Sequence, residues 1–183
     1  MIAVTALSLS LLSGFQGTEW GMSPAQVIFA QNLSPAARDW NSEHQSLFVD
    51  STVAGAEATI VYAFLDKKLY RVTVLFEASH LNKNLYIEDY ADMTRKMEKV
   101  YGEPEEVVAD WKNDLYQGRR EYYGMAIAAG HLVLRQTWRE GDTAIAHVLW
   151  GDNLETNHGL DYASVPMLRR KLQRDDERLK EEL

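Results

Sequence analysis

Two runs of alternating apolar side chains flank a short polar turn at residues 65–68. In the run 58–64 and in the run 69–76, β-branched and aromatic residues recur at every second position, and they are Ile60, Tyr62, Phe64, Tyr70, Val72, Val74 and Phe76. A period of two around a polar turn predicts a β-hairpin with one apolar face. The chain must therefore build an antiparallel sheet and cover one side of it.

A single helical stripe follows the hairpin. Over residues 84–101 apolar side chains recur at spacings of three and four, with charged residues on the remaining face, and the stripe consists of Tyr86, Tyr90, Met93, Met97, Val100 and Tyr101. Gly102 is placed to end this helix and Pro104 prevents its continuation. We expect a surface helix that lies on the sheet.

The other elements are less sharply marked. Ser23 and Gln26 form a capping box that begins a short helix at Pro24, which should end by Asn32. We expect an irregular connection over 33–46, a tight turn at 139–142, a polar loop over 152–158 and a charged helix after Pro166; the further strands expected are 46–53, 105–111, 120–128, 131–139, 143–150 and 158–163.

This order predicts an α+β fold in which antiparallel meanders carry helices on one face and a C-terminal helix follows. Each half reads as a helix followed by strands, so two α-β-β-β half-modules are compatible with the pattern. We interpret 1–15 as a signal-like apolar segment, 16–163 as one α+β domain with halves 16–80 and 81–163, and 164–183 as the terminal helix.

Composition excludes several classes of protein. The 183 residues contain no cysteine, which excludes disulfides, thiol nucleophiles and lipid-modified cysteines. A formal net charge of −8 argues against nucleic acid as a partner, because phosphate binding requires a basic surface. The first fifteen residues carry no charge, yet they are shorter than the roughly 20 needed to span a bilayer. They are typical of a secretory signal, so we expect a periplasmic or secreted protein, with a cytoplasmic one as the alternative.

No motif for catalysis stands out. The five histidines show no metal-binding spacing, and we interpret His131 and His147 as structural residues within strands. The polar stretch 152–158 lacks the spacing of a calcium loop, and no glycine-rich phosphate loop or GxSxG serine is present. We therefore predict no catalytic residue, no metal site and no cofactor, and we leave the binding residues unassigned.

Several short motifs carry a resemblance. Residues 20–27, Trp-Gly-Met-Ser-Pro-Ala-Gln-Val, and 101–104, Tyr-Gly-Glu-Pro, resemble the WGxSxxxV and YGxP motifs of small exported bacterial proteins of unknown function. The start Gly21, Met22 and Val27 is more distantly similar to the SmpA/OmlA lipoproteins and the related β-lactamase-inhibitor fold. That resemblance implies a helix-plus-meander module that binds other proteins, although this chain lacks the lipid-anchor cysteine.

Three functions remain open. The first is an exported, non-enzymatic binding or adaptor protein that recognises a protein or envelope component through a sheet face or an aromatic groove. The second is a small-ligand-binding or enzymatic protein with a cleft between sheet and helix, which would use groups such as His131, Arg135 and Glu121. The third is an intracellular scaffold that binds its partner through the C-terminal helix. A deep pocket that holds a histidine or carboxylate with a strongly shifted pKa would favour the second.

Overall fold

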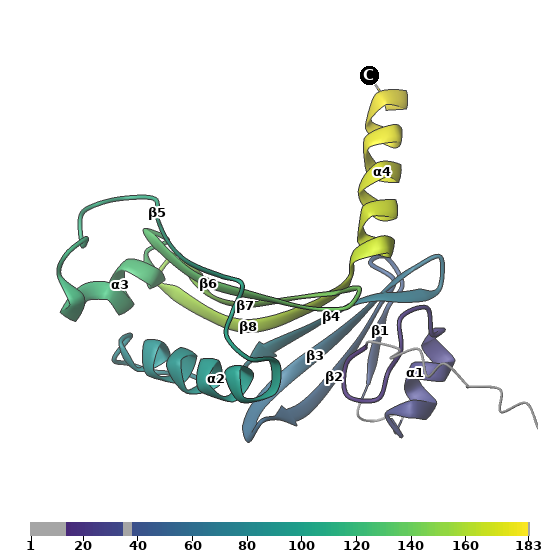
Figure 1. Ribbon diagram of the computed structural model, residues 1–183, viewed down its shortest axis with the longest axis horizontal. Coiled ribbons are helices and arrows are strands. Elements are labelled where there is room, and N and C mark those ends of the chain that lie inside the picture. Colours follow the sequence, from purple (N-terminus) through teal and green to yellow (C-terminus); the bar gives the residue numbers. More distant parts are fainter. Residues whose placement is uncertain (1–13, 35–37, 183) are drawn as a thin grey trace, which may run out of the picture.

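The computed structural model describes residues 14–34 and 38–182 of the chain (Figure 1). Its helices are α1 (Pro24–Ala30), α2 (Leu85–Tyr101), the 3₁₀ turn η2 (Arg120–Tyr122), α3 (Tyr123–Ala128) and α4 (Val165–Glu182). Its strands are β1 (Asp39–Asn41), β2 (Ser46–Val53), β3 (Ala56–Leu65), β4 (Lys68–Phe76), β5 (Glu106–Trp111), β6 (Leu132–Glu140), β7 (Thr143–Asp152) and β8 (Glu155–Ser164).

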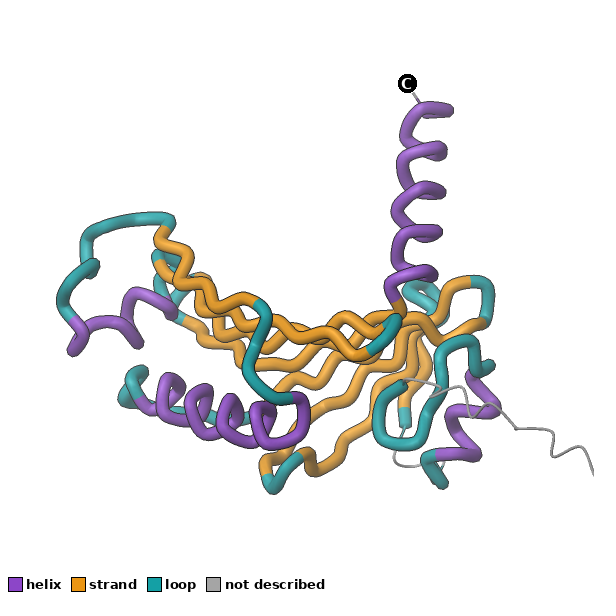
Figure 2. The backbone as a smooth tube through the Cα atoms, viewed as in Figure 1, coloured by secondary structure: helices purple, strands orange, loops and turns teal. Residues whose placement is uncertain are grey.

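All eight strands form one antiparallel sheet in the order β1-β2-β3-β4-β8-β7-β6-β5. Figure 2 shows this sheet as one continuous curved surface. Helices α1, α2 and α3 lie against one side of it, and α4 stands on the other side, near the end of β8 (Figure 1). The predicted α+β class, with its antiparallel meanders and C-terminal helix, is confirmed.

Tight turns connect most neighbouring strands. The turn residues Asp66 and Lys67, between β3 and β4, have φ of 51° and 59°, and Asn153 and Leu154, between β7 and β8, have 51° and 68°. Positive φ at both central residues matches the right-handed twist of a hairpin. The expected polar loop over 152–158 is therefore wrong, because the turn takes only two residues and β8 already begins at Glu155.

Two further expectations need correction. Residues 120–128 form η2 and α3 instead of a strand, because the backbone of Gly124 lies against Lys83 and Asn84, where a Cβ would meet the Lys83 carbonyl oxygen at 2.5 Å. Asn84 fixes this approach, since its Oδ1 accepts from the Gly124 N–H at 2.8 Å. The connection over 33–46 also contains a short strand, β1, which pairs with β2.

The helices otherwise follow the sequence pattern. Ser23 and Gln26 form the predicted capping box of α1. Helix α2 buries the predicted stripe against the sheet, except that Val100 is 71% exposed. Tyr101 occupies the sheet-facing position in its place, because four residues after Met97 the helix has returned to the same face.

The core has two parts, and α2 contributes to both. Met93 and Met97 pack into the larger cluster with residues of β2, β3, β4 and β8, while Tyr86 and Tyr90 pack with Ile127 of α3 and with β6 and β7. The buried Trp138 donates its indole N–H to the Gly102 carbonyl oxygen. The half-buried Trp20 donates its indole N–H to the Thr143 hydroxyl. Trp40 is the most exposed tryptophan among the described residues.

Among the described strands, β4 and β8 form the one hydrogen-bonded pairing between the two four-stranded meanders, from Arg71 opposite Ala163 to Leu75 opposite Gly159. Glycine is required near the end of this seam, because a Cβ at position 159 would lie 2.6 Å from the Val74 carbonyl oxygen. The neighbouring Leu160 is buried beneath α2. The seam therefore combines backbone pairing with core packing.

The signal-like segment falls mostly outside the described residues, which begin at Gly14. Phe15, its last residue, is 4% exposed and packs on the ring of Tyr162 in β8, with the ring centroids 4.9 Å apart. Within the described residues, none of the helices combines the length and apolarity needed to cross a bilayer.

Replacing Leu160 by alanine should lower the free energy of unfolding by about 3 kcal/mol, because the leucine is 2% exposed at the seam and its removal leaves a cavity. Urea unfolding measures the change. The matched control is Leu172→Ala on α4, where the side chain is 55% exposed and the expected change is below about 0.5 kcal/mol. Equal losses in the two variants would contradict the role assigned to the seam.

Candidate functional site

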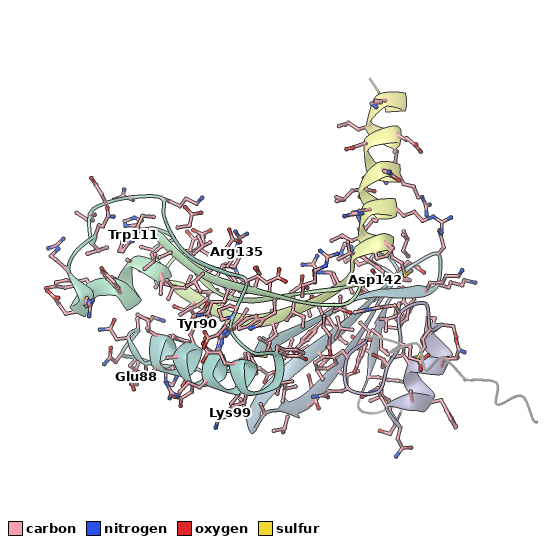
Figure 3. All side chains as sticks on the ribbon, viewed as in Figure 1. Glu88, Tyr90, Lys99, Trp111, Arg135 and Asp142 are labelled. Atoms are coloured by element: carbon pink, nitrogen blue, oxygen red, sulfur yellow. The ribbon has the colours of Figure 1, made fainter. Side chains whose placement is uncertain are left out.

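A cleft of about 370 Å³ opens between α2 and the sheet. Its walls come from the start of β3, the end of β4 with the segment that follows it, one face of α2, and β8. Figure 3 shows how α2 turns Tyr90 toward the sheet, while Glu88 and Lys99 point away from it. The lining residues are Ala56, Glu57, Phe76, Glu77, Ala78, His80, Asp89, Asp92, Met93, Lys96 and His158.

A pair of buried histidines lies behind this cleft. His147 of β7 and His158 of β8 are 0% and 4% exposed, and their Nε2 atoms are 2.7 Å apart. The register places His147 opposite Leu160 and His158 opposite Leu149, so the two rings are diagonal neighbours on one face. Tyr90 stacks on His147 with ring centroids 4.0 Å apart, and Phe76 packs on His158 at 4.6 Å.

A chain of hydrogen bonds determines which ring nitrogens carry protons. Thr94 of α2 donates its hydroxyl proton to Oε1 of Gln136 at 2.8 Å, so its oxygen is free to accept from Nδ1 of His147 at 3.2 Å. A neutral His147 with its proton on Nδ1 accepts at Nε2, and His158 must then donate from its own Nε2. Nδ1 of His158 is left with a lone pair.

That lone pair faces the cleft. Within the described residues, the buried side-chain polar atoms without a partner are Nδ1 of His131 and Oγ1 of Thr156. Nδ1 of His158 is not among them, although no described residue bonds to it, so this atom is accessible from the cleft that its residue lines. A ring that is otherwise buried therefore presents one hydrogen-bond acceptor to whatever occupies the cleft.

Burial keeps both rings neutral. It lowers the pKa of His147 to about 3, and the neighbouring His158 lowers it further. It lowers the pKa of His158 to about 4, against the smaller opposing effect of Asp89. Burial also raises the pKa of Tyr90, whose hydroxyl donates to the His147 carbonyl oxygen at 3.4 Å.

Acidic side chains dominate the rim. Four carboxylates line the cleft beside a single ammonium group, and they belong to Glu57, Glu77, Asp89 and Asp92. The ammonium of Lys96 donates to the carbonyl oxygen of Ala54 at 2.8 Å. His80 approaches Asp89 with its Nε2 2.6 Å from Oδ2. The segment that carries His80 is held by Tyr86, whose hydroxyl donates to the Ala78 carbonyl oxygen.

His131, Arg135 and Glu121, which the sequence offered as groups for a cleft between sheet and helix, do not lie together in the structure. Arg135 lies on the sheet face opposite α2 (Figure 3), where it pairs with Glu106. His131 stacks on Tyr116 beside α3, and Glu121 is exposed in η2. The histidines that do meet are His147, interpreted above as structural, and His158, which lies where the expected loop 152–158 adjoins the expected strand 158–163.

One sequence signal could have revealed the pair. A two-residue turn at Asn153 and Leu154 places His147 and His158 on the same face of a hairpin, two positions out of register with each other. The expected longer loop over 152–158 hid this relation. The contribution of Thr94 could not be read from the sequence, because it depends on how α2 is placed over β7.

The opposite face of the sheet carries no helix of the described chain along most of its width (Figure 1). At its centre the guanidinium of Arg71 pairs with Asp161 at 2.6 Å, and the Thr73 hydroxyl donates to the same carboxylate at 2.9 Å. Helix α4 is tied to the β3–β4 turn by Arg174 and Asp66, 2.6 Å apart. A partner at the sheet face or on α4 stays a prediction.

No family model, curated protein or solved structure matches the chain. The resemblance to small exported proteins and to SmpA/OmlA modules therefore stays a prediction. Among residues 14–34 and 38–182, no group of three or more histidine or carboxylate side chains is arranged to hold a metal ion.

The histidine pair predicts a pH dependence of stability. The unfolded chain binds protons at both positions as the pH falls through about 6.5, whereas the folded chain resists until about 4 and 3. The free energy of unfolding should therefore fall by about 1.5 kcal/mol per histidine between pH 6.5 and pH 5. Urea unfolding at a series of pH values measures it.

The double variant His147→Gln/His158→Gln should flatten this dependence between pH 6.5 and 5. The control His44→Gln removes an exposed histidine and should leave the slope as it is in the parent chain. A double variant with the full slope would show that other groups cause it.

Proposed function

We propose that the chain is a non-enzymatic binding protein whose ligand site is the cleft between α2 and the sheet. The observation that carries this proposal is Nδ1 of His158, an acceptor without a partner among the described residues, on a residue that is 4% exposed and lines the cleft. Because this acceptor is accessible from the cleft and has no partner among the described residues, a ligand that donates a hydrogen bond can satisfy it. A cleft between sheet and helix is the feature expected for the second of the three functions, a small-ligand-binding protein, and Phe76 and His158 are among the residues that line it.

The chemistry of the cleft favours binding over catalysis. A histidine with a pKa of about 4 is a weak base at neutral pH and is better suited to accepting a hydrogen bond than to removing a proton. The lining residues include no serine, threonine or cysteine that could act as a nucleophile. The only amine among them, on Lys96, is held by the Ala54 carbonyl oxygen. These features support a site that holds its ligand unchanged.

We further propose that the protein acts in the periplasm. The apolar, uncharged start of the chain supports this, as does the expected resemblance of residues 20–27 and 101–104 to motifs of small exported proteins. Phe15 contributes to the core through Tyr162, so removal of a signal must leave this residue on the mature protein. We therefore place the cleavage site of the signal segment between Gly14 and Phe15.

A filled cleft tests the ligand site. Ala56 is half-buried at the cleft wall, and Ala56→Trp should occupy the volume that a ligand would use. Three probes that share a benzene ring, namely benzylamine, benzyl alcohol and benzoate, are titrated while backbone amide signals are followed by NMR. At least one should bind with a dissociation constant of about 1 mM and shift amides of Phe76, Met93 and His158. Ala56→Trp should abolish those shifts.

The matched control for this experiment is Arg174→Ala, which alters the separate hollow between α4 and the β3–β4 turn. It should leave every titration unchanged. If all three probes fail to shift the cleft amides, the proposed ligand site is refuted.

The periplasmic proposal predicts a defined N-terminus. When the chain is produced in a bacterium with its own residues 1–15, the protein should be recovered from the periplasm with a cut before Phe15. Cell fractionation followed by N-terminal sequencing measures this. Retention of residues 1–14 on protein that stays in the cytoplasm would contradict export.

A further inference from the structure

We propose that the ligand of the cleft is a small organic cation, a protonated amine or guanidinium carried on an apolar body. This inference rests on the proposed function of the cleft and names the chemistry that the site selects. It follows from the kinds of hydrogen-bonding group that face the cleft, from their charge, and from the surface between them.

The acceptor at the floor (the buried end) of the cleft, Nδ1 of His158, requires a hydrogen-bond donor from the ligand. The chain of bonds from Gln136 through Thr94 and His147 leaves Nδ1 of His158 as an acceptor without a partner in the described residues. An N–H or O–H group satisfies this atom, whereas a carboxylate or phosphate oxygen would place two lone pairs against each other. Nδ1 of His158 therefore disfavours carboxylate and phosphate ligands because they lack a hydrogen to donate, independently of their charge.

The rim selects for positive charge. Its four carboxylates are acceptors only. Asp92 is paired with the Arg95 guanidinium and Asp89 contacts His80, while the one ammonium that lines the cleft, on Lys96, donates to a backbone carbonyl oxygen. Protonated amines and guanidinium groups carry several N–H donors and a charge opposite to that of the rim. A cation can therefore satisfy rim carboxylates and the floor acceptor together, which a hydroxyl with its single donor cannot.

The surface between floor and rim is apolar. Phe76, Met93 and two alanines line it, with the ring of His158 packed on Phe76. Burial of a hydrocarbon or aromatic body against these side chains supplies binding free energy without polar groups. A volume of about 370 Å³ is at the small end of ligand pockets and suits a compact molecule.

The three ring-bearing probes separate this inference from the function on which it rests. At pH 7 benzylamine is a cation, benzyl alcohol is neutral and benzoate is an anion. Benzylamine should bind at the cleft amides at least tenfold more tightly than benzyl alcohol, and benzoate should bind most weakly. If benzyl alcohol or benzoate binds as tightly as benzylamine, the cleft still binds ligands but the cation inference is overturned. If none binds, both proposals fall.

Variants of the rim carboxylates test whether these charges cause the preference for benzylamine over benzyl alcohol. Asp89→Asn/Asp92→Asn removes rim charge from exposed positions of α2 and should weaken benzylamine five- to tenfold while benzyl alcohol is unchanged. The control Asp175→Asn removes a carboxylate on α4, far from the cleft, and should change neither affinity. Unchanged benzylamine affinity in the rim variant would overturn the inference.

The floor is tested through Thr94, which we treat as a positioning residue. Thr94→Val removes the hydroxyl that accepts from Nδ1 of His147, and it should weaken benzylamine while Thr94→Ser restores it. Histidine ring ¹⁵N shifts report the tautomers directly: Nδ1 of His158 should be unprotonated in the parent chain and in Thr94→Ser. A protonated Nδ1 in the parent chain would overturn the proposed acceptor.

Discussion

The pairing of β4 with β8 is the interaction on which the rest of the structure depends. In the described part of the chain no other strand pairing joins the two meanders, and this one brings the Val74 carbonyl so close to β8 that residue 159 must be glycine. Helix α2 then crosses the joined sheet and packs into both parts of the core. The cleft lies at this crossing, since β4, β8 and α2 all contribute to its wall.

Helix α2 performs two tasks with neighbouring faces. Tyr90 and Thr94, one turn apart, reach His147 and hold it in place, whereas Asp89 and Asp92 belong to the wall of the cleft. Because the two sets lie on one helix, the placement of α2 determines both the orientation of the buried rings and the position of the carboxylates at the rim. The acceptor at the floor is thus prepared by the fold, at the cost of burying two histidines that must remain neutral.

Local patterns predicted most of the fold. The hairpin of β3 and β4, the helix α2 and the capping box of α1 depend on periodicity and capping within a few residues, and all three are present. The misassigned segment 120–128 is short and apolar, and its helix is decided by contact with the start of α2, which no local pattern reports. The site was missed for a related reason: a turn judged too long separated His147 from His158, and Thr94 meets them only through the tertiary fold.

The position of β8 in the sheet has a consequence for the timing of folding. Among the described strands β8 comes last in the sequence, yet it lies in the middle of the sheet, between β4 and β7. It also receives the ring of Phe15, which precedes all of these strands. A ribosome that has completed β7 has therefore produced two meanders that cannot yet join. Closure of the sheet must wait until β8 has been made, and it then forms contacts between residues far apart in the sequence, from Arg71 with Ala163 to Leu75 with Gly159, which makes folding slow.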